Sequence, residues 1–405
     1  PDTSPAPEAS PPETSAPSTG RLIGVDLARA LAVFGMYVVH LGPSADNTDG
    51  VGAWVRTAVE GRSSALFATL AGFSLMLIAG RLEPKTGVTG RQAKARIAIR
   101  AVVLLVLGTV MITFYGDVVI LASYGLFFLL AMPLLRLNAK ALAIIAAGIA
   151  VVGPLLAFGL KSLITEPARA AIKAYDSLAQ LGGAGLLDLL LTGFYPAIPW
   201  MAFIVAGMAL GRLDVSSGAV RKRLAVFGPA LAVFAYGTSW LLSLLFEGVA
   251  AAGEMQRPTG AGSGMKDIGS VGDMKQLSGQ FGSAWSLLTS GPHSGMPFDI
   301  IGCVGVAITV IVLAMMALDR LPLLRRLAAP VIAVGTMSLT AYVGHFVLSP
   351  SMAMSKGNES QSSWAPVLVF ILGAVVFAWI WSRFFRRGPL EYLLNLATKP
   401  AKYLR

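Results

Sequence analysis

Three ionisable side chains stand within one apolar segment near the N-terminus. Asp26, Arg29 and His40 all fall between residues 22 and 42. Ionisable groups inside a membrane-spanning segment are costly, and they usually mark a functional site. Arg29 and His40 are eleven residues apart, close to three helical turns, so they share one face about 16 Å apart along the axis. A cation and a titratable base in this arrangement would suit transfer of a chemical group across a membrane.

These three residues also have simpler interpretations. Asp26 and Arg29, three positions apart, can neutralise each other, and His40 can be solvated at the membrane interface near the end of the segment. If His40 is functional, its ordinary pKa of about 6.5 suits a general base, and arginine charge in a low-dielectric site would stabilise an oxyanion. We therefore take Asp26, Arg29 and His40 as candidate catalytic residues.

Further candidates lie near both ends of the apolar segments. Arg96 and Arg100 share a helix face and would suit the phosphates of a nucleotide-containing donor; flanking positive charge is the simpler interpretation. His345 lies inside a later segment, where packing against a polar neighbour is the simpler interpretation. On the outer side, four residues are candidates for an acceptor pocket near His40: Glu60, Arg62, His293 and Asp299.

The composition identifies the elements that must position these residues. Of 405 residues, 55% are hydrophobic and only 13% are charged, about half the charged fraction of soluble domains. The mean hydropathy is +0.70. The chain is therefore predicted to be a membrane protein. Its net charge of +11 does not indicate nucleic-acid binding, because the basic residues stand in short loops between apolar segments.

The apolar segments are long enough for helices that span a bilayer, which need roughly 20 residues each. They lack the period-2 alternation of barrel strands. The expected fold is an all-α polytopic bundle of about ten transmembrane helices, over 22–42, 63–80, 97–115, 118–136, 140–160, 193–211, 223–246, 298–318, 328–349 and 365–385. Lys and Arg concentrate in alternate loops, which places both termini in the cytoplasm.

Four segments fall outside these spans. Residues 1–20 are rich in Pro, Ser and Ala and are expected to be disordered. Residues 161–192 include an amphipathic stretch expected at the outer interface. Residues 247–296 form a Gly- and Ser-rich outer loop, either a lid over an outer cavity or simply a long loop. Residues 388–405 are expected to form an amphipathic helix on the cytoplasmic surface.

Several classes of site are not supported. One cysteine and three histidines make a metal site unexpected. The sequence has no Walker motif, no G-x-S-x-G elbow and no HExxH, which argues against nucleotide hydrolysis, serine hydrolysis and zinc proteolysis.

The candidate residues stand in recognisable motifs. RLIGVDLARALAVFGMYVVH and GRSSALFATLAGFSLML resemble the first two helices of heparan-α-glucosaminide N-acetyltransferase-like and YeiB-like membrane proteins. GTMSLTAYVGHFVL and RRGPLEYLLNLA resemble the end of the YeiB-like domain. The Arg29-to-His40 spacing also resembles the pattern of the acyltransferase-three family. The resemblance covers roughly residues 21–400.

The resemblance implies a membrane-embedded acyltransferase. It implies an acyltransferase-like transmembrane domain over residues 21–220 and a YeiB-like one over 221–387. Acyl-CoA, most simply acetyl-CoA, would enter from the cytoplasm, and the acyl group would pass to a sugar amine or hydroxyl on the outer side. His40 would act as general base or acyl carrier, Arg29 would stabilise the donor or developing negative charge, and Arg96 and Arg100 would bind the CoA phosphates.

Two other functions fit the same sequence. A transporter or flippase for a lipid or small solute could use Asp26, Arg29 and His40 for proton coupling, although the internal repeats are weak and no pair of Gly- or Pro-broken helices is evident. A non-catalytic membrane subunit is the third reading. In each case we expect a multi-pass protein of the plasma membrane in contact with lipid; a homodimer is one assembly left open.

Overall fold

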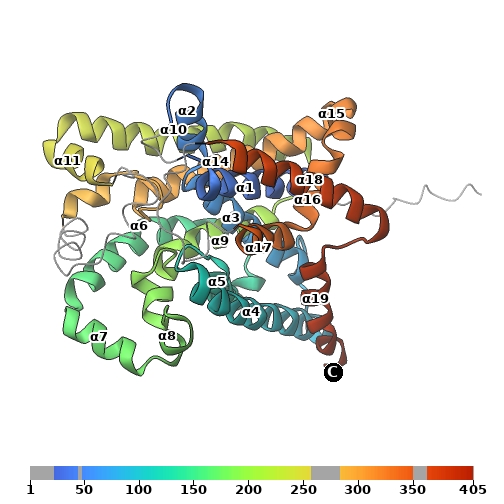
Figure 1. The fold of residues 1–405 in the computed structure, drawn as a ribbon, viewed down its shortest axis with the longest axis horizontal. Coiled ribbons are helices and arrows are strands. Elements are labelled where there is room, and N and C mark those ends of the chain that lie inside the picture. The colour runs from blue at the N-terminus through green and yellow to red at the C-terminus, as the bar shows by residue number, and fades with distance from the viewer. Residues whose placement is uncertain (1–21, 44–47, 257–282, 350–362, 405) are drawn as a thin grey trace, which may run out of the picture.

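The computed structural model describes residues 22–43, 48–256, 283–349 and 363–404, which are helical with connecting loops and include no strand (Figure 1). The predicted all-α membrane bundle is confirmed. The N-terminal tail and residues 257–282, the part of the outer loop for which a lid was considered, lie outside the described residues.

Seven helical segments of the described chain are long and apolar enough to cross a membrane, or eight if one bent pair counts as a span. The seven are α1 (Ile23–Leu41), α2 with α3 (Gly50–Val59, Arg62–Ala79), α4 (Gly87–Tyr115), α6 (Ala139–Leu163), α10 (Gly218–Leu245), α14 (Pro297–Arg320) and α18 (Ala365–Phe384). The bent pair is α16 (Ala329–Thr336) and α17 (Ser338–Leu348). Two shorter apolar helices are α5 (Leu121–Ala131), continued by η2 (Met132–Arg136), and α9 (Ala197–Gly211). Each of the ten predicted spans coincides with one of these segments.

The ninth predicted span differs from expectation. Residues 328–349 were expected to form one continuous helix, but α16 and α17 meet at 84°. The break falls at Met337, which has φ −124° and ψ 40°. The single helix expected here is therefore two helices, because the residues that stabilise the bend come from a distant part of the chain and leave no local sign in the sequence.

The centre of the bundle is α9, in which almost every side chain is buried. It packs tightly against α3 through small residues. A Cβ at Gly207 would overlap the Thr69 carbonyl oxygen, and a Cβ at Gly72 would overlap that of Ile204. Small residues allow such close backbone approach between membrane helices. On another side, α3 packs against α1.

Short helices cover the two ends of the bundle (Figure 1). One end carries α7 (Glu166–Tyr175), α8 (Ser177–Gly182), η3 (Asp188–Thr192), α11 (Glu247–Met255) and η4 (Ala284–Leu288). The other carries α15 (Pro322–Leu327), α19 (Pro389–Ala397) and η6 (Lys399–Tyr403). We name these the His40 end and the Asp26 end, after the residues of α1 that lie towards each.

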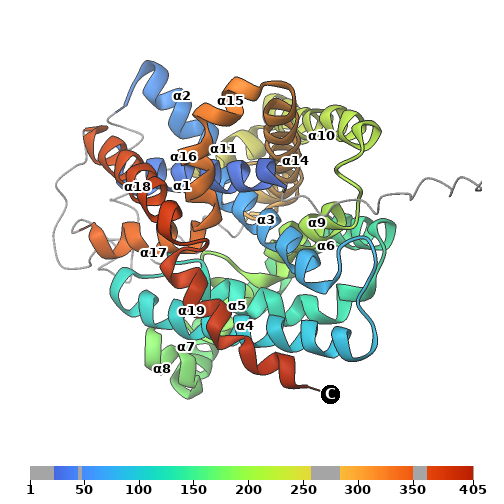
Figure 2. The same ribbon diagram turned by 90° about the vertical axis from the view of Figure 1, so that its right-hand side faces the viewer.

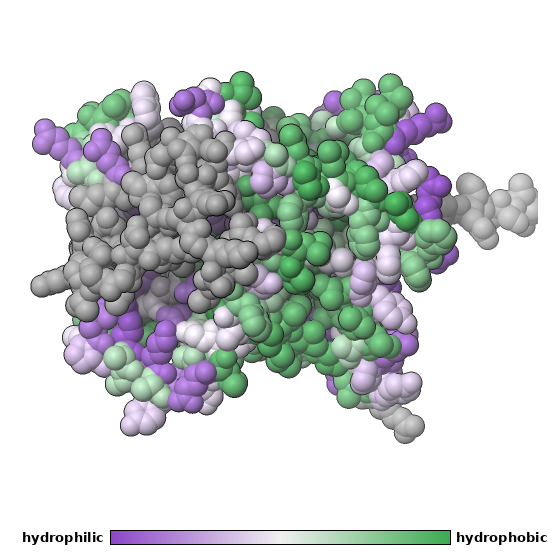
Figure 3. Space-filling model, viewed as in Figure 1, coloured by the Kyte–Doolittle hydropathy of each residue, from purple (hydrophilic) through white to green (hydrophobic). Residues whose placement is uncertain are grey.

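The C-terminal segment lies across the Asp26 end, where α19 and η6 run beside α4 (Figure 2). The Gln92 side chain donates to the carbonyl oxygens of Lys402 and Leu404, at 3.0 and 3.1 Å. Hydrophobic side chains fill the middle of one face, with hydrophilic side chains at its left and right edges (Figure 3). This pattern fits a helix bundle embedded in a bilayer, with the cytoplasmic placement of both termini still a prediction.

Candidate functional site

The His40 side chain at the end of α1 contacts a second histidine on α17. His40 Nδ1 lies 2.9 Å from His345 Nε2, and the two ring planes are within 14° of parallel. His345 is 1% exposed, whereas His40 is half-buried. His345 Nδ1 is hydrogen-bonded to the Tyr342 carbonyl oxygen. The structure thus joins His40 to a residue 305 positions away, which sequence reasoning had left as a packing histidine.

The two hydrogen bonds together assign the tautomers. A carbonyl oxygen can only accept, so His345 Nδ1 must carry the hydrogen that it donates to Tyr342. In a neutral ring His345 Nε2 is then an acceptor, and His40 Nδ1 must be the donor to it. The lone pair of His40 is left on Nε2, which has no hydrogen-bond partner within the described ranges. A histidine held in one tautomer by a partner is the arrangement that a general base needs.

Aromatic contacts fix α17 against α1 around this pair. The Tyr37 hydroxyl donates to the Ala341 carbonyl oxygen at 2.8 Å, and the Tyr37 and His345 rings have centroids 4.9 Å apart. Phe346 contacts both histidine rings. The Tyr342 hydroxyl accepts a hydrogen bond from the Ile120 amide at 3.2 Å. The histidine pair is therefore surrounded by packed side chains of α1 and α17 and by the residue that precedes α5.

Asp26 and Arg29 pair with each other at the opposite end of α1. Arg29 Nη1 lies 2.7 Å from Asp26 Oδ1, and Arg29 Nη2 donates to Ser74 Oγ on α3, also at 2.7 Å. The neutralising interpretation of their spacing is thus seen in the structure. Because the guanidinium is held towards α3 and His40 contacts α17, these contacts do not bring Arg29 and His40 together.

The predicted acceptor-side residues are linked to His40 indirectly: His293 lies within electrostatic reach of His40, and Gly61, between Glu60 and Arg62, packs against the His293 backbone. Arg62 lies over the Tyr236 ring, 4.8 Å from its centroid. The Tyr236 hydroxyl lies 3.3 Å from Cys303 Sγ, which lies 3.4 Å from Asp299 Oδ1. A chain of polar contacts therefore links Arg62 to Asp299 through two residues that the sequence had not singled out.

Glu60 instead pairs with Arg56, a residue that sequence reasoning missed. Arg56 Nε lies 3.7 Å from Glu60 Oε2, and Arg56 Nη1 donates to the Pro43 carbonyl oxygen at 2.7 Å, three residues beyond His40. The Arg56 side chain is only 2% exposed, and its Nε and Nη2 atoms have no hydrogen-bond partner among the residues that the structure describes. A buried guanidinium with free donors is suited to bind an anion or an oxyanion.

His293 packs among aromatic side chains of the loop before α9 and of α9 itself. Its ring centroid lies 4.8, 5.9 and 6.3 Å from those of Phe194, Tyr195 and Trp200. Burial lowers the pKa of His293 to about 4. The ring is thus neutral near pH 7, and it lies within electrostatic reach of His40.

This lowered pKa predicts a specific pH dependence of stability. The pKa of an unfolded histidine is about 6.5, so between pH 6.5 and 4 the unfolded chain binds more protons than the folded one, and acid destabilises the fold. Between pH 7 and 5, wild type should lose on the order of 1 kcal/mol more unfolding free energy than His293→Phe. Denaturation in detergent micelles at both pH values measures this; equal losses in the two proteins would contradict it.

Arg96 and Arg100 lie on α4 near the Asp26 end, as expected. Neither forms an ion pair with any other residue of the described chain, and Arg100 lies within electrostatic reach of Arg96 and of Arg387, which precedes α19. Three cations from two elements are thus grouped where the C-terminal segment crosses α4. Such a group favours an anionic ligand.

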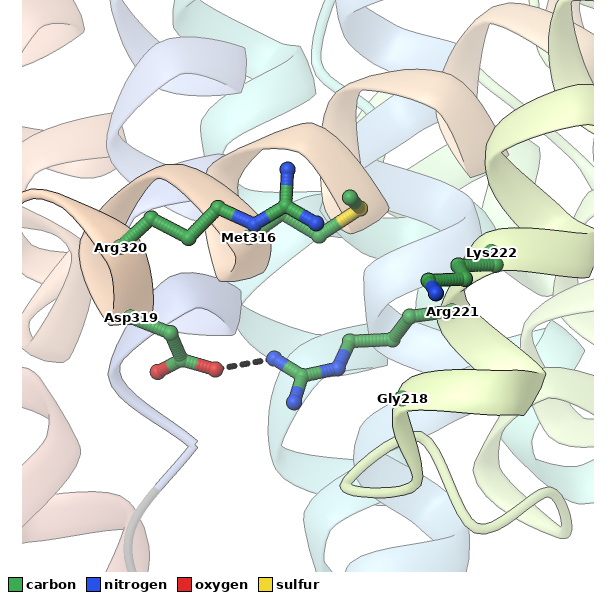
Figure 4. Close-up of a pocket in the computed structure, with 6 residues that line it drawn as sticks. All are labelled: Gly218, Arg221, Lys222, Met316, Asp319 and Arg320. Carbon is green, nitrogen blue, oxygen red and sulfur yellow. Dashed lines mark hydrogen bonds and ion pairs between the residues drawn. The ribbon is translucent and has the colours of Figure 1, made fainter.

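Two cavities lie away from the histidine pair. The larger, about 130 Å³, opens between the ends of α10 and α14, where Arg221 pairs with Asp319 beside Lys222 and Arg320 (Figure 4). The smaller, about 10 Å³, is lined by Asp117, Asp188 and Tyr195 among others, and burial, with the Asp188 charge, raises the pKa of Asp117. Neither is lined by Arg29 or His40.

No group of three or more His, Cys, Asp and Glu side chains that could hold a metal is found within the described residues. The titratable and charged side chains brought together around the end of α1 are His40, His345 and Arg56. His345 had a sequence signal, being a titratable residue within a span. Arg56 had none beyond its position between two apolar segments.

Two family models match the chain. One, described as "Heparan-alpha-glucosaminide N-acetyltransferase, catalytic", matches residues 21–242, more than half of the sequence. The other, "Protein of unknown function (DUF418)", matches residues 273–400. No curated protein matches significantly. His40 lies in the first matched region and His345 in the second, so the histidine pair joins the two.

Proposed function

The chain belongs to the heparan-alpha-glucosaminide N-acetyltransferase catalytic family, and from this we propose that it is a multi-pass membrane acyltransferase that moves an acyl group, most simply acetyl, from acyl-CoA to an amine or hydroxyl of a sugar. The observation that carries the proposal is the hydrogen bond from His40 Nδ1 to His345 Nε2. It leaves His40 Nε2 as a base directed away from its partner.

The proposed reaction needs one proton acceptor and one site for negative charge. The acceptor nitrogen or oxygen attacks the thioester carbonyl carbon while His40 Nε2 takes its proton. The tetrahedral intermediate carries its charge on oxygen, where the free N–H donors of Arg56 would stabilise it. Collapse breaks the carbon–sulfur bond, and the CoA thiolate leaves with the proton returned by His40.

Arg29 is assigned to the donor side of this scheme. Eleven residues of helix separate it from His40 by about 16 Å along α1, too far to contact an oxyanion formed at His40. Its contacts with Asp26 and Ser74 hold the charge in place. Acyl-CoA would then enter from the cytoplasm at the Asp26 end, with the acceptor at the outer, His40 end, in the plasma membrane.

The direct test uses purified protein in lipid nanodiscs, with acetyl-CoA as donor and glucosamine among a panel of amine and hydroxyl acceptors. Release of free CoA thiol together with an acetylated acceptor, identified by mass spectrometry, is expected. If acetyl-CoA neither binds nor is consumed with any acceptor, the proposal fails.

Arg96 and Arg100 provide a prediction for donor binding. If they bind the CoA phosphates, Arg96→Ala and Arg100→Ala should each raise the Kd for acetyl-CoA by about tenfold or more, because a hydrogen bond to a charged group contributes about 1.5–3 kcal/mol. Calorimetry on the detergent-solubilised protein measures the change. Lys94→Ala, which removes a cation from the same helix, is the control; an equal effect there would indicate only a general charge contribution.

One observation also supports a transporter. Broken helices often form substrate sites in transporters, and α16 and α17 are a broken pair whose bend lies beside α1: a Cβ at Gly335 would overlap the Asp26 carbonyl oxygen. Counterflow of labelled glucosamine in proteoliposomes, with no covalent change, would favour proton-coupled transport over transfer.

A further inference from the structure

The bend between α16 and α17 creates a second helix start within the bundle. The first amides of a helix have no partner inside it and need an external acceptor. At the N-cap, Ser, Thr, Asp or Asn usually provides one. In α17 this position is Met337, whose thioether is at best a weak acceptor. The amides that follow must be satisfied by another part of the chain.

A carboxylate from the C-terminal helix fills this role. Glu391 Oε1 accepts from the amides of Leu339 and Thr340 at 2.7 and 3.2 Å, and Glu391 Oε2 accepts from Thr340 Oγ1 at 2.6 Å. The same Thr340 hydroxyl oxygen accepts from the Leu390 amide at 3.1 Å. The geometry is that of an N-cap supplied from a residue about fifty positions away.

Close backbone packing brings Glu391 to this place. A Cβ at Gly388 would collide with the Met337 side chain and with the Glu391 carboxylate. The segment Gly388-Pro389-Leu390-Glu391 therefore fits directly against the bend. The interaction is between the carboxylate and the positive end of α17, since Glu391 is in none of the ion pairs seen for the described residues.

The capped helix carries the second histidine of the site. α17 has only 11 residues, and so short a helix is marginal without external contacts. Tyr342 and His345 lie within its next two turns, and the Tyr342 carbonyl oxygen holds the His345 ring. A change in the start of α17 is thus transmitted to His345 Nε2 and then to His40.

We propose that Glu391 is a positioning residue for the histidine pair: by capping α17 from the C-terminal helix, it holds His345 where it fixes the tautomer of His40. The expected effect on catalysis rests on the proposed function, whereas the expected effect on the tautomers of the two histidine rings does not. Through this contact the C-terminal region, which matches a family of unknown function, acts on a base in the region that matches the catalytic family.

The test compares wild type, Glu391→Ala and Glu391→Gln, with Tyr392→Ala as control because that neighbouring side chain is 58% exposed. The chain has only three histidines, so 15N-histidine NMR in nanodiscs resolves each ring, with His40→Gln and His345→Gln variants for assignment. Turnover of acetyl-CoA is measured on the same samples.

In wild type and the control, both rings should show hydrogen on Nδ1. Glu391→Ala should lose this pattern and lower kcat about 100-fold, the usual result of a small misplacement of a catalytic group, with KM for acetyl-CoA unchanged within about twofold. Glu391→Gln keeps an acceptor oxygen, so its ring signals and its kcat should be intermediate between those of wild type and Glu391→Ala. If Glu391→Ala does not fold, a partial loss of the ring signals and of kcat in folded Glu391→Gln still shows a positioning effect that misfolding does not explain.

Wild-type ring signals in folded Glu391→Ala, or in Glu391→Gln if only that variant folds, would overturn the proposal. If wild type transfers no acyl group at all, the proposed function fails, and the ring signals alone still decide whether Glu391 positions the histidines.

Discussion

Replacement of His40 by alanine is expected to lower acyl transfer by about 10²–10⁴-fold, the usual contribution of a positioned general base. The expectation follows from the free Nε2 lone pair that the His345 contact assigns to His40. Because the proposed donor site lies at the opposite end of α1, the Kd for acetyl-CoA should not change. Release of CoA thiol in nanodiscs and calorimetric binding measure the two quantities.

The control is His345→Gln, which keeps a polar side chain on α17 but removes the second ring. It should lower transfer by less than His40→Ala, because the base remains and only its orientation is lost. Acyl transfer at the wild-type rate by folded His40→Ala would exclude His40 as the base. A larger fall in the acyl-transfer rate in His345→Gln than in His40→Ala would indicate that His345 is the base.

Loss of the Arg29 charge is expected to destabilise the fold by about 3 kcal/mol, the lower part of the range for breaking a buried ion pair. The Arg29→Met variant leaves Asp26, whose side chain is 9% exposed, without the cation that lies 2.7 Å from it. It also removes the contact between α1 and Ser74 of α3. Equilibrium unfolding in mixed micelles gives the change in free energy.

The matched comparison is the double variant Asp26→Asn with Arg29→Met. Removing both charges takes away the buried carboxylate together with the cation that neutralises it, so the double variant should recover most of the lost stability. If the single variant is as stable as wild type, or the double variant is no more stable than the single one, then the pair is not the source of the effect.

The helices could be predicted because the apolar segments are long and the chain has few charges. The bend at Met337 could not, because the α17 amides that it exposes are capped by Glu391, far along the chain. Likewise, α5 and α9 are shorter than the predicted spans. Their ends depend on packing within the bundle, as the buried surface of α9 shows.

In the candidate site, too, contacts within one helix could be predicted from the sequence, whereas contacts between distant helices could not. The Asp26–Arg29 pair could be read from its spacing because both residues lie on one helical turn. The His40–His345 contact joins two spans, and no local pattern reports which helices are neighbours. Of the residues expected near His40, His293 lies within electrostatic reach of it, while Arg62 contacts Tyr236 and Asp299 contacts Cys303.

The distance in sequence between His40 and His345 also has a consequence during synthesis of the protein. Chains are made at about 5–20 residues per second, so the 305 residues between the two histidines take roughly 15–60 s to translate. During that interval the first span is in place without its partner, and Glu391 is made later still. A nascent chain that ends before the last helix would therefore contain both histidines without Glu391, the residue that caps α17.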